Sequence, residues 1–423
     1  MNKINQIIKN LGPGLLYAGA AVGVSHLVAS TKAGAKYGFL LLLFIPLIHI
    51  VKYPFYRFGP EYTAITGKNI LHGYNKLGKW ALFTYMGMTI LTMCLIQSAI
   101  TIVTTSIALK FFGWDLPINY AAIAVLLGAG SILYFGKYDL LDKVMKFVIL
   151  ILTATTIIAV SAVLFKAPGG FHEAPAPIFE FTNVADALFL AAFLGWMPAP
   201  MDITVWHSVW SEEANRSSGK KADLKQSMFD FKVGFIGTAC LAMCFLALGA
   251  LVMYGSGEEI SPKGTVFAGQ LIQMYTAALG PWAYPLIGIA ALATMVSTTL
   301  TCMDAYPRTL DEAVLILKEE KENSERKKDS KMIYRAFLLL TVVGTIIIFL
   351  FFMKSMGQLV TLATVVAFVS APIIALINHL VMNGATIPEQ HKPSLLIKNW
   401  SRLGIICLFV FSTWYVWISF LKN

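Results

Sequence analysis

Long apolar runs separated by short polar segments set the pattern of this 423-residue chain. A helix needs about 20 residues to cross a hydrocarbon core about 30 Å thick, and the runs reach that length. The pattern therefore predicts an all-α polytopic membrane protein, with a single transmembrane domain over residues 1–423 and eleven spanning helices. Their approximate bounds are 12–35, 38–58, 80–110, 117–136, 143–165, 183–209, 228–254, 278–304, 333–353, 357–382 and 399–420.

Two of these spans are interrupted at corresponding places. The first carries a break between Gly19 and His26, and the sixth carries Met-Pro-Ala-Pro-Met-Asp from Met197 to Asp202. Backbone groups at bilayer depth must be hydrogen-bonded within the protein, so a break is tolerated where it is buried or lines a wet cavity. The matched breaks indicate a transport site.

Five spans precede the second broken span. A second copy of the first five would therefore begin at the sixth span and lie in the opposite orientation in the membrane. Inverted repeats with discontinuous first and sixth helices are typical of the LeuT-type transporter fold. The prediction is repeat one at about 11–166, repeat two at about 183–383 and an accessory helix at about 399–420.

The composition agrees with a membrane protein and points away from an enzyme. Hydrophobic residues make up 57% of the chain and charged residues 13%, whereas a soluble domain has about a quarter charged residues. The chain lacks a metal-protease HExxH, a nucleophile elbow and a phosphate-binding glycine loop. Neither an enzymatic activity nor a cofactor is expected.

Basic residues give the expected topology. With the N-terminus in the cytoplasm, most of the 33 Lys and Arg fall in the inner segments, which places the C-terminus outside. This asymmetry accounts for the net charge of +10 without a nucleic-acid partner. The first ten residues lack a cleavage pattern, so no removable signal peptide is expected, and the short termini suit a bacterial inner membrane. The sequence leaves the oligomeric state open, and a monomer is a reasonable expectation.

Several motifs resemble one transporter family. The stretch from Gly12 to Phe39 begins with Gly-Pro-Gly and aligns without gaps with the opening helix of the Nramp (natural resistance-associated macrophage protein) divalent-metal transporters. Further similarity lies at Ala64–Lys68, at Gly136–Lys146 and at Met197-Pro198 followed by His207-Ser208. The resemblance implies a LeuT-type fold and transport of a divalent metal ion by alternating access, as a symport with protons.

The divergence from that family lies at the site itself. The family carries Asp-Pro-Gly-Asn at the first break, where Asp and Asn bind the metal, whereas this chain has Gly23-Val24-Ser25-His26. The family's Met-Pro-His in the sixth helix becomes Met197-Pro198-Ala199 here. The resemblance therefore implies a metal site rebuilt from other groups.

Imidazole, carboxylate and thioether ligands suit Mn²⁺, Fe²⁺ or Co²⁺ better than Mg²⁺ or Ca²⁺. His26 is the first candidate ligand because it occupies a family ligand position, and the alternative is a histidine hydrogen-bonded inside the bundle. Asp202 is a ligand or proton carrier, or else a cap of the following half-helix. The candidate substrate-binding or metal-binding residues are His26, Asp202, Met197, Met201, Gly23 and Ser25.

Polar residues in the third and eighth spans could line the pathway, with helix-to-helix hydrogen bonding as the alternative. The candidates are Gln97, Thr101, Thr294, Ser297, Thr298 and Thr301. Asp304 and Arg308 are one helical turn apart and predict an ion pair. Lys52 and His49 in the second span are expected to snorkel or pair without a role in transport.

Two functions remain open at this point. Loss of the first-helix Asp removes a titratable group, and His26 could replace it in proton coupling because an imidazole titrates near neutral pH. A LeuT-type site without that carboxylate could equally hold a small organic solute, since Gly19 and Gly23 make room for one. The expected partners are therefore the lipid bilayer and either a divalent metal ion or a small solute.

Overall fold

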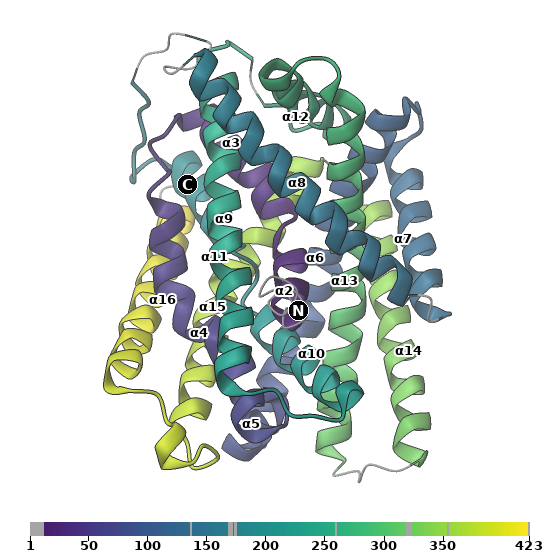
Figure 1. The fold of residues 1–423 in the computed structure, drawn as a ribbon, viewed down its shortest axis with the longest axis vertical. Helices are drawn as coiled ribbons and strands as arrows, with labels where there is room; N and C mark the ends of the chain where they lie inside the picture. The colour runs from purple at the N-terminus through teal and green to yellow at the C-terminus, as the bar shows by residue number, and fades with distance from the viewer. Residues whose placement is uncertain are drawn as a thin grey trace, which may run out of the picture.

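The computed structural model describes residues 12–135, 138–167, 172, 176–258, 260–318, 324–352 and 355–421. Within these residues the chain is helical, with short π-helical (η1 to η3) and 3-10 (η4) segments and no strand (Figure 1). The elements are α2 (Pro13–Ala21), η1 (Ser25–Ser30), α3 (Thr31–Tyr37), α4 (Phe44–Thr66), α5 (Ile70–Leu77), α6 (Lys79–Phe112), α7 (Ile118–Tyr134), α8 (Tyr138–Lys166), α9 (Val184–Gly195), α10 (Ile203–Ser218), α11 (Leu224–Leu248), η2 (Gly249–Met253), α12 (Gly264–Leu279), α13 (Ala283–Leu317), α14 (Ser324–Ile347), η3 (Ile348–Phe352), α15 (Met356–Asn383), η4 (Glu389–His391) and α16 (Leu395–Leu421).

Each of the eleven predicted spans coincides with a helix or with consecutive helices. Both predicted breaks are present: the first span is α2, η1 and α3, and the sixth is α9 and α10. By length and composition, six described helices qualify as spans, or seven when the bent pair of the first span counts as one. Two short helices that the apolar pattern does not predict, α5 and α12, lie at opposite ends of the bundle (Figure 1). We call these ends the α5 end and the α12 end.

The N-terminal residues 1–11 lie outside the described part of the chain. They include the segment in which no signal peptide is expected, two lysines that contribute to the predicted topology, and the predicted start of repeat one.

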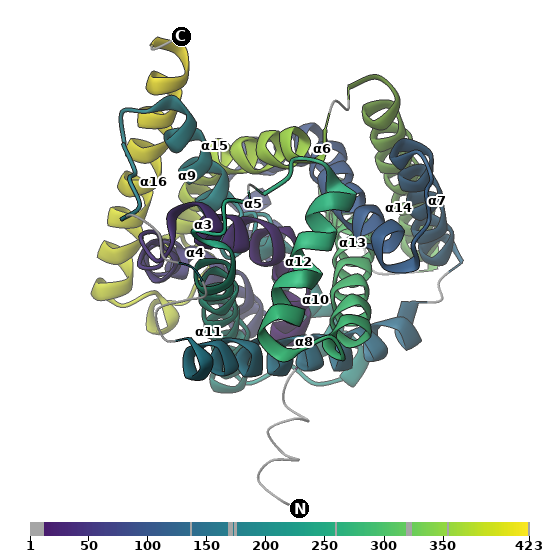
Figure 2. The same ribbon diagram turned by 90° about the horizontal axis from the view of Figure 1, so that it is seen from above.

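Burial separates central helices from peripheral ones. In the most apolar 18-residue stretch of each helix, 72% of α13 is buried, against 28% of α14 and 33% of α16. From above, α16 lies at one edge of the bundle and α7 and α14 lie at the opposite edge (Figure 2). The peripheral helices expose large apolar side chains such as Leu340, Phe351 and Leu403, as expected for faces that meet lipid.

Local sequence signals set the helix ends. The side chain of Asn183 accepts from the amides of Ala185 and Asp186 at the start of α9, and Asp223 caps α11 in the same way. Helices α4 and α10 each end at a glycine in the left-handed region, Gly67 (φ +78°) and Gly219 (φ +66°), which favours glycine because it has no Cβ.

Helix α4 approaches α10 closely at Gly59, which predicts a stability effect. A Cβ at Gly59 would lie 2.1 Å from the Thr204 carbonyl oxygen. We expect Gly59→Ala to cost about 1–3 kcal/mol of stability through overpacking, seen as a lower midpoint of thermal unfolding in detergent. Gly87→Ala is the matched control, since a Cβ there has nothing within 4 Å. Equal midpoints for the two variants would contradict the close contact.

Candidate transport site

The break in the first span lies between α2 and η1. The two parts of this span are bent by 47°, and the carbonyls that end α2 face α13. The Thr298 hydroxyl lies 3.4 Å from the carbonyl oxygens of both Gly19 and Val22. Gly23 is in contact with the same side chain, because a Cβ there would lie 2.8 Å from Thr298 Cγ2. The absence of a side chain at Gly23 therefore allows α13 to pack closely against the break.

The break in the sixth span is held by a lysine of α4. The Lys52 ammonium donates to the carbonyls of Leu194, Gly195 and Met197 at 2.9, 3.0 and 2.9 Å. Its side chain is 0% exposed, so of the two expectations for Lys52, snorkelling or pairing, the structure shows pairing with backbone carbonyls. The carbonyls at a helix C-terminus carry partial negative charge and have no partner in their own helix. The Lys52 ammonium therefore supplies the positive charge next to these carbonyls.

Tyr56 and Thr204 add two further bonds between α4 and this break. The Tyr56 hydroxyl donates to the Ala199 carbonyl, and the Thr204 hydroxyl donates to the Phe55 carbonyl at 2.9 Å. Together with Lys52, these bonds hold the unwound segment along one side of α4.

His26 is hydrogen-bonded through both ring nitrogens. Nε2 lies 3.1 Å from the Thr238 carbonyl oxygen of α11, and Nδ1 lies 2.8 Å from the Ser25 hydroxyl. A carbonyl only accepts, so Nε2 carries the hydrogen and Nδ1 accepts from Ser25. The Ser25 hydroxyl also lies 3.2 Å from the Ala21 carbonyl oxygen. If His26 gained a proton, Ser25 could accept from Nδ1 and donate to Ala21, so this hydroxyl serves both protonation states.

Asp202 is the buried acid beside the second break. It is 7% exposed and occupies the N-cap position of α10, yet its side chain makes no capping bond. Among the described residues, no donor lies within hydrogen-bond or ion-pair distance of this carboxylate. Its electrostatic neighbours are hydroxyl and thiol groups, those of Tyr56, Tyr74, Tyr85, Tyr306 and Cys302. A buried carboxylate without a counter-charge is costly, so this position suits a cation or a proton.

His26 and Asp202 are the imidazole and carboxylate candidates at the breaks. Neither belongs to a group of three described side chains close enough to share an ion. In the part of the chain that the structure describes, the three His, Cys, Asp or Glu side chains close enough to share an ion lie at the α5 end. At the breaks, Asp202 offers its carboxylate, while His26 is directed to Ser25 and α11.

Comparisons with known proteins place the chain in a family. The model of the natural resistance-associated macrophage protein-like (Nramp) family matches residues 14–418. An uncharacterized protein of Pasteurella multocida (strain Pm70) is 35% identical over 410 residues, which cover 96% of this chain and 91% of that protein. This chain belongs to the Nramp family. Nramp proteins are metal-ion transporters and not enzymes, so the expected absence of enzymatic activity agrees with the family.

Solved structures show the fold of this Nramp protein. A manganese transporter of Eremococcus coleocola matches with a TM-score of 0.68 at 16% identity, over 97% of this chain and 87% of that chain. MhsT in complex with L-phenylalanine gives 0.58 at 16% identity, over 96% and 97%. Mhp1, a nucleobase-cation-symport-1 family transporter with bromovinylhydantoin bound, gives 0.56 at 13% identity, over 97% and 93%. The LeuT-type fold predicted from the two breaks is confirmed.

The remaining candidate site residues of this Nramp protein are buried, some at the second break and some between α6 and α13. Met197 and Met201 are buried at the second break. Gln97 donates to the Thr101 hydroxyl at 3.2 Å and to the Thr299 carbonyl at 3.3 Å, which joins α6 to α13. The other α13 candidates, Thr294, Ser297 and Thr301, are also buried. A role for all these residues in the pathway stays a prediction, as do the repeat boundaries.

The expected ion pair between Asp304 and Arg308 is confirmed. The Arg308 Nε and Nη2 atoms each lie 2.9 Å from a carboxylate oxygen of Asp304. The Tyr334 hydroxyl donates to the same carboxylate at 2.8 Å. This acid is therefore fully engaged, in contrast to Asp202.

Two residues at the breaks were overlooked as candidates. Lys52 lies in an apolar run, and an intramembrane charge is a functional candidate by default, so its residue type was a usable signal. His207 is buried, stacks on Tyr17 with ring centroids 5.6 Å apart, and leaves Nδ1 without a hydrogen-bond partner among the described residues. In the sequence, His207 stands out only as part of the family resemblance.

Proposed function

We propose that this Nramp protein moves a divalent transition-metal ion across a bacterial inner membrane by alternating access, with Asp202 as the anionic ligand. The observation that carries this proposal is the buried Asp202 carboxylate, which no described side chain neutralises. A divalent cation would supply the missing counter-charge. Family membership supports a metal ion as the cargo.

The remaining ligands of the ion would come from the same unwound segment. The thioethers of Met197 and Met201 favour Mn²⁺, Fe²⁺ or Co²⁺ over Mg²⁺ and Ca²⁺. His26 would join them only if its ring leaves Thr238 in another state of the transport cycle.

We also propose that metal movement is coupled to protons. Two groups can hold the proton. The Asp202 carboxylate can be neutralised by a proton when no ion is bound, and Ser25 is placed to accept from Nδ1 of His26 if that ring takes up a proton. The α5 end would face the cytoplasm, as the distribution of Lys and Arg predicts.

A second candidate function is transport of a small organic solute. It is favoured by lysines that lie close to the two broken spans. A cavity of about 200 Å³ between η1, α3, α9 and α15 is lined by Lys32 and by Lys36, which is paired with Asp186 at 3.3 Å, and Lys52 adds a buried ammonium at the break. These charges disfavour a divalent cation and suit an anionic solute such as a carboxylate. MhsT, a structure of the same fold, holds an amino acid.

Uptake by purified protein in liposomes separates the two functions. We expect saturable accumulation of Mn²⁺ and Co²⁺, reported by quenching of an internal metal-sensitive dye, with inward proton movement reported by a pH dye. Mg²⁺ and Ca²⁺ should compete weakly because they prefer all-oxygen sites. Protein-free liposomes are the control. Metal accumulation no greater than in that control, together with uptake of radiolabelled amino or carboxylic acids, would replace the metal proposal with the second candidate.

A further inference from the structure

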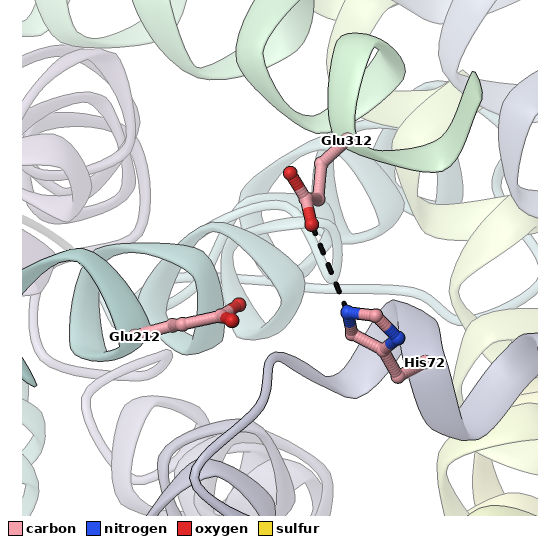
Figure 3. Close-up of side chains that lie close together, drawn as sticks. All are labelled: His72, Glu212 and Glu312. Atoms are coloured by element: carbon pink, nitrogen blue, oxygen red, sulfur yellow. Dashed lines mark ion pairs between the residues drawn. The ribbon is translucent and has the colours of Figure 1, made fainter. Parts of the chain in front are cut away.

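Three side chains from three separate elements meet at the α5 end (Figure 3). They are His72 of α5, Glu212 of α10 and Glu312 of α13, and each offers one ligand atom such that all three atoms lie within 4.8 Å of one another. The His72 Nε2 and Glu312 Oε1 atoms are 3.7 Å apart, which is too long for a hydrogen bond. All three side chains are partly buried, so water and ions can reach them.

The surrounding donors orient the two carboxylates. The Asn69 backbone amide donates to Glu212 Oε2 at 3.0 Å, and its side-chain amide donates to the same oxygen and to Glu312 Oε1 at 3.4 Å. Arg216 lies 3.6 Å from Glu212 Oε1. The two Asn69 bonds use the lone pairs of Glu212 Oε2, so this carboxylate would bind an ion through Oε1. Donors of this kind, placed behind metal ligands, fix the direction in which the ligands point.

We propose that His72, Glu212 and Glu312 form a divalent transition-metal site, separate from the transport site. One imidazole and two carboxylates suit Mn²⁺, Fe²⁺, Co²⁺ or Zn²⁺, with water completing the shell, whereas Mg²⁺ and Ca²⁺ seldom take an imidazole. The proposal does not depend on the nature of the transported substrate.

The position of this group gives the bound ion a regulatory consequence. Helix α10 follows the broken segment that carries Asp202, and α13 reaches the break of the first span through Thr298. An ion that binds all three side chains joins α5, α10 and α13. A ligand that binds one arrangement of these elements shifts the population toward it. An ion bound to all three side chains would therefore favour the arrangement of the α5 end described here.

Metal counting on the full-length protein tests the site. The tag-free protein is dialysed against Co²⁺, the bound ions are counted by mass spectrometry, and ligation is followed by visible absorption. We expect His72→Ala and Glu312→Gln each to weaken one equivalent of Co²⁺ binding at least about tenfold. Two variants at exposed positions are the controls: Glu213→Gln, next to Glu212 in the sequence, and His391→Ala, in η4. Both should keep the equivalent of bound Co²⁺. Asp202→Asn should also keep it, which separates failure of this site from failure of the transport site.

A ligand swap keeps the test decisive if a variant folds poorly. His72→Cys retains a ligand but replaces nitrogen with sulfur, so we expect the site to shift its preference toward Cd²⁺ by at least about tenfold. A simple ion pair between His72 and Glu312 would not produce that shift. Unchanged Co²⁺ stoichiometry and affinity in folded, monodisperse His72→Ala and Glu312→Gln would overturn the proposal.

Discussion

Lys52→Met is expected to abolish transport and to lower thermal stability strongly. The change removes the donor to three carbonyls inside the bundle. Each buried acceptor left without a partner costs about 1–3 kcal/mol, and charge-assisted bonds are the stronger ones. The measurements are the initial rate of uptake in liposomes and the midpoint of thermal unfolding in detergent. Lys79→Met, at the exposed start of α6, is the control for loss of a lysine.

A smaller side chain at position 52 tests whether the ammonium acts as a cation. Lys52→Ala leaves space beside the carbonyls of Leu194, Gly195 and Met197, and unwound carbonyls of this fold bind Na⁺ in related transporters. We expect Na⁺, compared with a large organic cation at equal ionic strength, to raise the unfolding midpoint of Lys52→Ala but not of the wild type. Normal uptake by Lys52→Met would show that the break does not need this donor.

The two breaks solve one electrostatic problem in two ways. The carbonyls that end α2 lie 3.4 Å from a neutral hydroxyl, that of Thr298, which is closer to the Thr294 carbonyl of its own helix at 3.1 Å. Those that end α9 accept from the charged ammonium of Lys52 at 2.9–3.0 Å. Hydrogen bonds from a charged donor are shorter and stronger. The first break is therefore held loosely and the second tightly. This difference favours the segment around Gly23 as the one that moves during transport.

The sequence predicted the helices and breaks because those signals are local. Apolar length marks each span, and glycine and proline mark the two interruptions. It could not predict that Lys52 meets Met197, because the contact joins residues 145 positions apart. The direction of the His26 ring was equally hidden, since Thr238 lies 212 positions away. The His72 group was missed because its members come from three elements, one of them the unpredicted helix α5.

Asp202→Asn is expected to reduce metal uptake by at least about 100-fold, equivalent to about 2.7 kcal/mol of lost interaction at the site. The amide keeps the shape of the side chain and removes the charge that the ion would neutralise. The same change should leave the unfolding midpoint unchanged or raise it, because a neutral amide is cheaper to bury than an unpaired carboxylate. Asp115→Asn, in the exposed turn after α6, is the control for loss of an acid.

Uptake and the unfolding midpoint of Asp202→Asn must be measured together, because they separate a role in substrate binding from a role in stability. A residue kept for stability loses stability when changed, whereas a residue kept for function often costs stability in the wild type. Lost uptake with a retained or higher unfolding midpoint would therefore identify the Asp202 charge as part of the substrate site. Full Mn²⁺ uptake by Asp202→Asn would contradict the metal ligand role, and a matching fall in stability and uptake would assign Asp202 to the scaffold that holds α10.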